Sequence, residues 1–361
     1  MRTLSPPVLP AGDPGLGGSL RLRPVGARDV AGLVDQFADP ASARWTRAPQ
    51  PYRAEDARRF VDGQVPDGWR SGRSLVLAVE LDGRFAGTVE LRPDGAGAAE
   101  VGYAVAAWAR GRGAAAAALR AFLTWAWPAL DLQVVHWRAE VGNWASRRVA
   151  WACGFQVEGQ VRGLLVTRDG QRADGWVGSL RRGEPMHPAG AWLDVPVIEL
   201  GAVRLRPWRE QDAPRVVEAC ADPATQRWLP RLPTPYTLAD AQEYVAAQLE
   251  RAADGQGVDW CVADSADDQV LAAVSLTTPV PGRSPAEIGY WAHPAGRGRG
   301  VVTRAVRAAA RHALIDAADG GLGAPRVVIR VAEGNDASAR VAERAGFRLA
   351  CRVRQGEQWR D

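Results

Sequence analysis

Alternating apolar and polar side chains open each half of this chain. Leu20–Pro24 alternates with period two, as a strand with one buried face does, and Val203–Pro207 repeats the pattern. Helical periodicity follows each strand. These helices are predicted to begin at Asp29 and Asp212, whose carboxylates suit a helix N-cap. Because a second helix is expected after a Pro-Tyr pair in each half, both halves start with a strand and two helices.

The later patterns follow the same order in both halves. Three strands joined by hairpins are predicted next, then a long Ala-rich helix, a strand, and a final helix that stops at a Gly-Phe pair. After that stop, residues 156–180 read as a two-strand hairpin, whereas residues 348–361 have room for one strand, near Ala350–Arg354. This order predicts an α/β (α+β) fold with a mixed, largely antiparallel sheet flanked by helices.

The two halves are copies of one another. Four sequence blocks recur in order, and their offset grows from 183 residues at Arg21/Arg204 to 192 at Gly142/Gly334, as loop insertions would produce. A period near 190 residues is too long for a solenoid, whose repeats span roughly 20–50 residues. The predicted segments are a Pro/Gly-rich disordered tail (1–18), domain one (19–183), a linker (184–196) and a C-terminally truncated domain two (197–361).

Composition argues against several classes of function. The formal charge is +4 and charged residues make up 24% of the chain, which does not favour nucleic-acid binding. The four Cys residues form no CxxC pair and the four His residues have no ligand spacing, so no metal is expected. Because no apolar run approaches about 18 residues and no secretory signal is visible, we expect a cytoplasmic protein without a membrane partner.

A Gly/Arg-rich turn stands between a predicted strand and the long helix of each half. Its sequence is RGRGAA at Arg110–Ala115 and RGRGVV at Arg297–Val302. Small residues let backbone N–H groups approach a ligand, and a helix N-terminus favours an anion. Either turn alone could be a basic surface loop. The recurrence of the turn at the same place favours a phosphate-binding site.

Polar side chains near this turn are candidates for the chemistry. Glu100 and Glu287 occupy matching strand positions, and each could accept a proton from an amine. Glu90 is another candidate, but Ser275 occupies roughly its place in domain two, so Glu100 is preferred. Each final helix has an Asn and a Ser three residues apart on one face, where the alternative role of the Asn is an N-cap. These pairs are Asn143 with Ser146 and Asn335 with Ser338.

Together these motifs resemble the GCN5-related N-acetyltransferases (GNAT superfamily). The turn fits the R-x-x-G-x-[GA] pattern of that family. The motif N-x-x-S-x-x-V-x-x-x-x-G-F of the final helix resembles its ribosomal-protein N-terminal acetyltransferase (RimJ/RimL-like) branch. The resemblance covers nearly the whole chain, twice. It implies two tandem domains in which a bulged strand of each mixed sheet holds acetyl-CoA as co-substrate, with no metal.

The resemblance also implies roles for single residues. Backbone amides of the turn would bind the coenzyme A pyrophosphate, the preceding strand would bind the pantetheine arm, and the helix Asn would lie near that arm. The strand Glu would be the general base, and the helix Ser would act near the departing thiolate. The coenzyme-binding residues would be Val101, Tyr103, Arg110, Arg112, Gly113, Ala114, Ala115, Asn143, Arg297, Arg299, Gly300, Val301, Val302 and Asn335, and the catalytic ones Glu100, Ser146, Glu287 and Ser338.

The chain departs from the family pattern in places. Many relatives carry a Tyr acid on the final helix where this chain has Ala150 and Ala342, and Val302, where Gly or Ala is usual, is expected to crowd the pyrophosphate. Domain two is predicted to lack the final strand. The open sheet edge at Ala350–Arg354 then invites pairing within a homodimer or between the two domains.

The predicted function is transfer of an acetyl group from acetyl-CoA to a primary amine by direct attack. The acceptor is expected to be a protein N-terminus or a small molecule. The alternative is an acyl-CoA-binding regulatory protein in which one or both halves are inactive.

Overall fold

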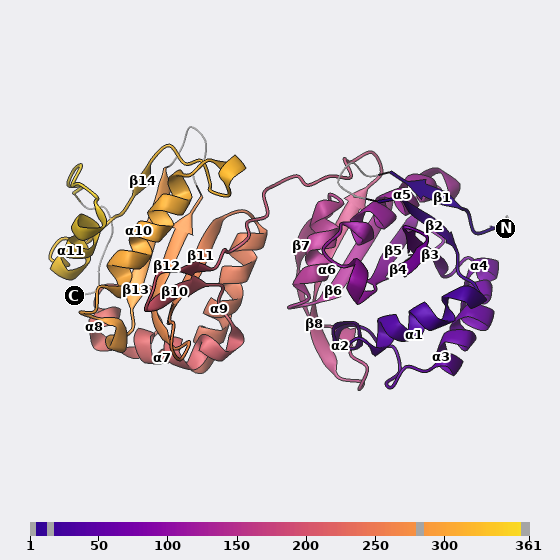
Figure 1. Cartoon of the computed structure of the whole chain (residues 1–361), viewed down its shortest axis with the longest axis horizontal. Coiled ribbons are helices and arrows are strands. Elements are labelled where there is room, and N and C mark those ends of the chain that lie inside the picture. Colours follow the sequence, from indigo (N-terminus) through magenta and orange to yellow (C-terminus); the bar gives the residue numbers. More distant parts are fainter. Residues whose placement is uncertain (1–4, 13–17, 279–284, 355–361) are drawn as a thin grey trace. The chain divides into compact units, whose positions relative to one another are not determined.

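The predicted opening strands and helices form as expected in a computed structural model that describes residues 5–12, 18–278 and 285–354. The chain divides into two units between Ala189 and Gly190, inside the segment that the sequence predicts to be a linker (Figure 1). Each unit is a mixed sheet with helices on both faces, so the predicted fold class is confirmed.

The first unit has an eight-stranded sheet in the order β1-β2-β3-β4-β5-β6-β8-β7. Only the β5/β6 pair is parallel among these described strands. The strands are β1 (Leu9–Ala11), β2 (Leu20–Pro24), β3 (Leu75–Leu81), β4 (Arg84–Pro93), β5 (Ala98–Val105), β6 (Val134–Glu140), β7 (Gln156–Val166) and β8 (Arg172–Arg181). The helices are α1 (Val30–Ala38), α2 (Pro40–Trp45), α3 (Ala54–Arg59), α4 (Val65–Ser71), α5 (Ala114–Ala129) and α6 (Trp144–Ala152).

Helices cover both faces of this first sheet. Leu119 and Phe122 of α5 are fully buried in the larger core, and α6 packs beside α5 on that face. On the other face α1 and α3 bury Leu33 and Ala57 in a smaller core. Since each face of the sheet is apolar, both layers of helix are needed to keep it from water.

The predicted disordered tail is wrong for part of the described N-terminus. Leu9–Ala11 form β1, which pairs antiparallel with β2 and places Leu9 opposite Leu22. Ala11 is buried against the core. Pro10 is tolerated because β1 is an edge strand, where one side of the backbone needs no ladder partner.

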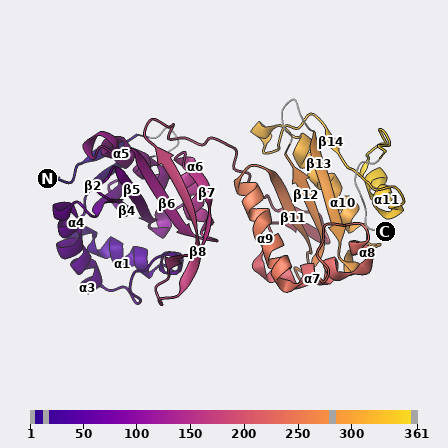
Figure 2. The same cartoon turned by 180° about the vertical axis from the view of Figure 1, so that it is seen from behind.

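The second unit has a six-stranded sheet in the order β14-β13-β12-β11-β10-β9 (Figure 2). One core lies between this sheet and α10, and another lies under α7 and α9. The strands are β9 (Ile198–Glu199), β10 (Val203–Arg206), β11 (Gly257–Asp264), β12 (Val270–Thr277), β13 (Ala286–Ala292) and β14 (Val327–Val328). The helices are α7 (Ala213–Ala221), α8 (Pro223–Gln226), α9 (Leu238–Ala253), α10 (Val301–Leu314) and α11 (Asp336–Ala345).

Two strand predictions for the second half are wrong. The expected strand over residues 326–333 is reduced to Val327–Val328, which pair with the start of β13. Ala350–Arg354 form no strand, so β14 is the described edge of this sheet. The first unit supplies the reason: β7 pairs there with β8, which lies between β6 and β7. Without a counterpart of β8 among the described residues, a counterpart of β7 has no ladder to join.

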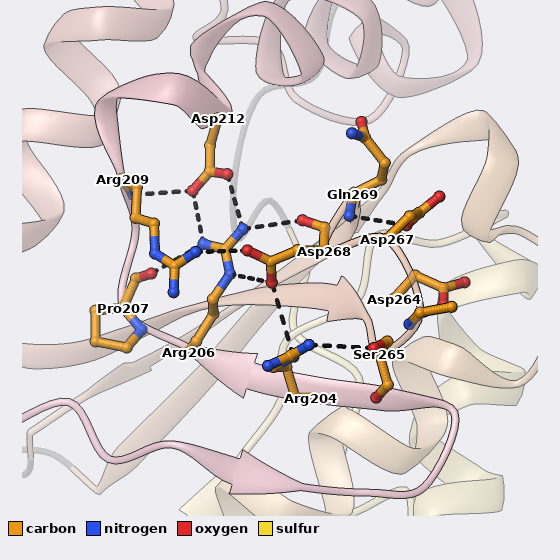
Figure 3. Close-up of polar contacts among 11 residues, drawn as sticks. Arg204, Arg206, Pro207, Arg209, Asp212, Asp264, Ser265, Asp267, Asp268 and Gln269 are labelled. Carbon is orange, nitrogen blue, oxygen red and sulfur yellow. Dashed lines mark hydrogen bonds and ion pairs between the residues drawn. The ribbon is translucent and has the colours of Figure 1, made fainter.

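A buried arginine fixes the start of the second unit. Arg206 on β10 is 1% exposed. It donates to both carboxylate oxygens of Asp212 at 2.8 Å and, through Nε, to Asp268 at 2.9 Å (Figure 3). Burial acts to lower the pKa of Arg206, but the hydrogen bond that it donates to Asp212 and the nearby charges raise it. The cation is therefore paired on two sides inside the fold.

The first unit has the same buried arginine arrangement, with Glu80 in the place of Asp268. Arg23 donates to Asp29 at 2.7 and 2.8 Å, and its Nε donates to Glu80 of β3 at 2.6 Å. Asp29 and Asp212 stand at the predicted N-cap positions of α1 and α7, but neither side chain makes a cap hydrogen bond there. Their carboxylates bind the buried arginines instead.

Candidate functional site

The parallel strands β5 and β6 separate along their length. They pair from Ala98/Val134 to Val101/Trp137, and no further pairing joins them in the described structure, although β5 continues to Val105. Val101 is therefore the last residue of β5 that pairs with β6. Backbone groups beyond it need a partner on the side that faces β6. An extended chain with amide groups can supply that partner.

A cavity of about 1310 Å³ opens where these strands separate. Its wall includes Tyr103 of β5, Trp137 of β6 and Ser146 of α6. Aromatic side chains from the α2–α3 region and the turn between β7 and β8 complete the wall. Ligand cavities commonly hold roughly 300–1,000 Å³, so this one has room for more than one small substrate.

The Gly/Arg turn lies directly after β5. Gly111 and Gly113 have φ angles of 71° and 74°, a left-handed conformation that glycine adopts without strain. Helix α5 begins at Ala114, so the first backbone N–H groups of the helix have no partner within it. Gly298 and Gly300 repeat this conformation before α10. Both turns can therefore bind an anion with backbone donors.

The arginines of the turn hold it in place. Arg110 donates to Asp39 and Ser42 at the start of α2, and this hydrogen bond lowers the pKa of Asp39. Arg112 pairs with Asp82 at 3.1 Å. The second unit pairs Arg297 with Asp222 and Arg299 with Asp264. The predicted arginines thus contact neighbouring elements, and the two glycines of the first turn, Gly111 and Gly113, are exposed.

The helices after the two turns differ in their first side chains. Ala114 and Ala115 open α5, whereas Val301 and Val302 open α10. Val301 and Val302 are 1% and 8% exposed and lie in the core of the second unit. The side chain of Val302 thus packs into this core, and the crowding of a bound pyrophosphate stays a prediction.

Glu100 lies on the cavity wall between two arginines. One carboxylate oxygen accepts from Arg92, its cross-strand neighbour on β4, and the other pairs with Arg138 of β6. In the second unit a single arginine, Arg330, the counterpart of Arg138, donates to both carboxylate oxygens of Glu287. Each oxygen of Glu100 thus already accepts from an arginine, and each keeps a further lone pair for another donor.

Glu90 also lines the cavity. Its Oε1 accepts from Ser74 at 2.6 Å and its Oε2 from Arg92, so Glu90 and Glu100 share one guanidinium. Glu90 projects from β4 opposite Val76 of β3. The carboxylate thus lies on the cavity wall beside Ser74 and Arg92.

In the second unit the corresponding carboxylate lies on β11, the counterpart of β3, and not on β12, the counterpart of β4. Ser275 matches Glu90 in sequence, but the residue opposite Ser275 is Asp259, where the first unit has Val76. Asp259 is 2% exposed, and its Oδ2 accepts from Arg251 at 3.0 Å. Its Oδ1 has no hydrogen-bond partner in the described structure. Comparison of the two halves of the sequence does not reveal that Asp259 stands across from the position of Glu90, because this correspondence depends on the strand register.

The helix Asn and Ser are brought together at the start of α6. Asn143 Oδ1 accepts from the backbone N–H of Ser146 at 3.1 Å and therefore caps the helix. Ser146 Oγ accepts from Trp137 Nε1 at 3.0 Å and donates to Tyr103 Oη at 3.1 Å. The Tyr103 hydroxyl donates to the carbonyl oxygen of Ser146 at 2.8 Å. Burial raises the pKa of Tyr103, so its phenol stays neutral.

The second unit repeats the cap and the two hydroxyl contacts. Asn335 caps α11 through the N–H of Ser338 at 3.1 Å. Ser338 Oγ donates to Tyr290 Oη at 3.0 Å, and that hydroxyl donates to the Ser338 carbonyl oxygen at 3.0 Å. From the sequence, Tyr103 is expected to bind the pantetheine arm through its backbone, and its hydroxyl is not singled out. The Gly-Tyr pair that follows Glu100 and again follows Glu287 was the available signal.

Aromatic rings gather on β13 of the second unit, one residue after Tyr290. Trp291 stands where the first unit has Ala104, a residue of the cavity wall. Its ring centroid lies 6.0 Å from that of Trp208 and 6.3 Å from that of Tyr244. The two units therefore carry different side chains at this strand position beside matching turns.

The described residues contain neither a metal-ligand cluster nor a membrane-spanning helix. No three or more His, Cys, Asp or Glu side chains there are grouped to hold a metal ion. No helix in the same residues has the length and apolar character to cross a membrane.

Comparison with known proteins identifies the family. The family model described as an acetyltransferase (GNAT) domain matches residues 19–156 and again residues 202–348. A Bacillus subtilis (strain 168) protein, YdaF, named provisionally as a ribosomal N-acetyltransferase, is 32% identical over 152 residues, which cover 40% of this chain and 81% of the relative.

Solved structures with detectable similarity include two ribosomal-protein acetyltransferases. Mycobacterium smegmatis RimJ in complex with CoA-disulfide is 28% identical, with a TM-score of 0.43 and coverage of 49% of this chain and 88% of that one. A ribosomal-protein-S5-alanine acetyltransferase of Vibrio fischeri is 19% identical, with a TM-score of 0.41 and coverage of 46% and 94%. Two family-model matches and a relative above 30% identity establish that the chain belongs to the GNAT acetyltransferase family, with one such domain in each half.

Proposed function

We propose that this protein is an N-acetyltransferase that transfers an acetyl group from acetyl-CoA to a primary amine. The observation that carries the proposal is the separation of β5 from β6 next to a turn that ends at a helix N-terminus. The unpaired strand backbone suits the amides of pantetheine, and the turn suits a pyrophosphate. Family membership supplies the reaction class.

The donor site would be built mainly from backbone. In the first unit the N–H groups of Arg112, Gly113, Ala114 and Ala115 would bind the pyrophosphate, and Val101–Tyr103 would bind the pantetheine arm. In the second unit the corresponding donors are Arg299, Gly300, Val301 and Val302. Asn143 and Asn335 keep their capping role and place the start of the last helix beside the thioester.

The reaction requires little further chemistry from the protein. The amine and the thioester must be held together, the amine must lose a proton, and the tetrahedral oxyanion must be stabilised by donors. Glu100 is the proposed base because Glu287 reproduces it in the second unit. Glu90 is the second candidate because it lines the same cavity and shares Arg92 with Glu100.

The acceptor is proposed to be a protein N-terminus. The support is the relative that is 32% identical, whose name assigns it to the ribosomal N-acetyltransferases. The cavity agrees with an extended acceptor, because its wall runs from the α2–α3 region to the turn between β7 and β8. A small amine is the alternative acceptor.

The proposal is tested by assaying the full chain with acetyl-CoA and a panel of amines while released thiol is detected. The panel holds peptides with free N-terminal Ser or Ala, the same peptides with blocked N-termini, and small primary amines. Turnover of the free peptides alone is expected. Calorimetric titration with coenzyme A runs beside the assay. Binding without turnover of any amine would favour an acyl-CoA-binding regulatory protein, and absence of binding would reject the donor site.

A further inference from the structure

The last helix of each unit lacks a side chain that could protonate a departing thiolate at the position used by many relatives. That position is Ala150 in α6, which is fully buried, and Ala342 in α11. A thiolate that leaves without a proton is a poor leaving group. Some other donor near the start of the helix would make the reaction more efficient.

A phenol hydroxyl from the neighbouring strand reaches this place in both units. Tyr103 Oη lies 3.1 Å from Ser146 Oγ and 2.8 Å from the Ser146 carbonyl oxygen. Tyr290 and Ser338 repeat the pair at 3.0 and 3.0 Å. Tyr103 and Ser146 both line the cavity, and Tyr103 lies just beyond Val101, where β5 and β6 cease to pair.

The surroundings of the pair differ between the units, while the pair itself does not. Trp137 donates its indole N–H to Ser146 Oγ at 3.0 Å. The counterpart of Trp137 is Ile329, which has no such donor. The contact between Tyr and Ser is therefore kept where the neighbouring hydrogen bond is absent, as expected of a feature that serves the site.

We propose that Tyr103, and Tyr290 in the second unit, is the group that donates a proton to the sulfur of coenzyme A as the acetyl group leaves. This inference rests on the proposed acetyl transfer. Ser146 and Ser338 are positioning residues in this scheme. Before the reaction, the carbonyl oxygen of each serine accepts a hydrogen bond from the phenol. The serine hydroxyl in turn donates a hydrogen bond to the phenol oxygen.

The step balances as follows. The amine nitrogen bonds to the acetyl carbon, the C–S bond breaks, and its electron pair stays on sulfur. The Tyr103 hydroxyl turns from the Ser146 carbonyl to the sulfur and transfers its proton, which yields the thiol. The phenolate accepts the Ser146 hydroxyl hydrogen bond until water reprotonates it. The proton lost by the amine passes to a carboxylate of the site and then to water, so the products are the amide and coenzyme A.

A purely structural role is the competing explanation. The same two hydrogen bonds fasten α6 to β5, and removal of the phenol hydroxyl would loosen that junction. A readout at the sulfur atom separates the two roles, since fastening the helix does not change the acidity of a bound thiol.

The decisive measurement is the pKa of the thiol of coenzyme A bound to the full chain, followed by thiolate absorbance. A hydroxyl that donates to sulfur stabilises the thiolate. The Tyr103→Phe/Tyr290→Phe double variant should therefore raise the pKa of the bound thiol by about one to two units. Tyr236→Phe is the matched control, because it removes another buried phenol hydroxyl in the second unit and should leave the thiol unchanged.

The second measurement compares acetyl-CoA with acetyl-seleno-CoA as donors to a peptide with a free N-terminal serine. A selenolate leaves without a proton because a selenol is far more acidic than a thiol. The double variant should lose about 10²-fold in kcat with acetyl-CoA and little with the selenium donor. Equal losses with both donors, or an unchanged thiol pKa, would overturn the assignment. Failure of the wild-type chain to bind coenzyme A would overturn the proposed function as well.

Discussion

The two units are alike at the Gly/Arg turn and at the start of the last helix, and they differ on the strands beside them. Both have a turn with two left-handed glycines before a helix, an Asn cap on the last helix, and a Tyr–Ser contact at that helix. The proposed acceptor wall of the first unit holds Ala104, and Trp291 takes this place in the second unit. The carboxylate Glu90 of β4 has its counterpart in Asp259, which lies on the strand paired with the counterpart of β4.

The difference extends to the sheet edge. In the first unit β8 pairs with β6, and the turn between β7 and β8 contributes to the cavity wall. Among the described residues of the second unit, no strand follows α11. A donor site made of backbone can survive such changes, because it depends on the path of the chain. An acceptor site made of side chains cannot.

The largest expected effect tests the shared donor side. Gly113→Glu places a side chain at φ 74° and a carboxylate where a pyrophosphate would bind, so it should abolish coenzyme A binding to the first unit. Gly300→Glu should do the same to the second. In the full chain each variant should halve the binding stoichiometry measured by calorimetry. Gly95→Glu is the control, since Gly95 also has a positive φ (81°) and open space around it but lies in the β4–β5 turn.

The next effect tests whether the two units are equally active. Glu100→Gln should lower turnover by about 10²- to 10⁴-fold in the first unit with coenzyme A affinity nearly unchanged. Glu287→Gln should remove less of the total activity, because the first unit has the open cavity. Glu90→Gln is the comparison that decides between the two carboxylates. A larger loss with Glu287→Gln on the physiological acceptor would reverse the roles of the units.

A third effect concerns the scaffold, where the units should behave alike. Asp29→Ala and Asp212→Ala each leave a buried arginine without its bidentate partner. Removal of one member of a buried ion pair typically costs about 3–5 kcal/mol of unfolding free energy. Calorimetric scans of the full chain should show a lowered transition in each variant. A loss confined to one variant would mean that the second acid, Glu80 or Asp268, suffices there.

The smallest effect transplants the acceptor wall of one unit into the other. Ala104→Trp should fill part of the first cavity and raise the KM for the amine about tenfold, which corresponds to about 1.4 kcal/mol. Trp291→Ala is the reverse exchange and should widen the amines accepted by the second unit. Coenzyme A affinity, measured beside each KM, should not change. An unaltered KM in both variants would show that this wall does not contact the acceptor.

Much of this architecture could be predicted from the sequence. The period-two strands, the amphipathic helices and the recurrence of whole blocks depend on local pattern, and local pattern is what a sequence displays. The turn at Gly113 is equally local, because the left-handed conformation requires glycine in that place. Fold class, duplication and family are therefore properties that the sequence alone determines.

Tertiary structure decided the features that depend on neighbours distant in sequence. β1 forms because β2 offers an edge, although its Pro-rich segment resembles a disordered tail. The arginines that flank Glu100 come from β4 and β6. The correspondence between Asp259 and Glu90 is visible only in the register of the paired strands. The Tyr103 hydroxyl meets Ser146 because β5 and α6 pack together 43 residues apart. A linear pattern records which side chains are present, but only the packing of strands and helices determines which of them touch.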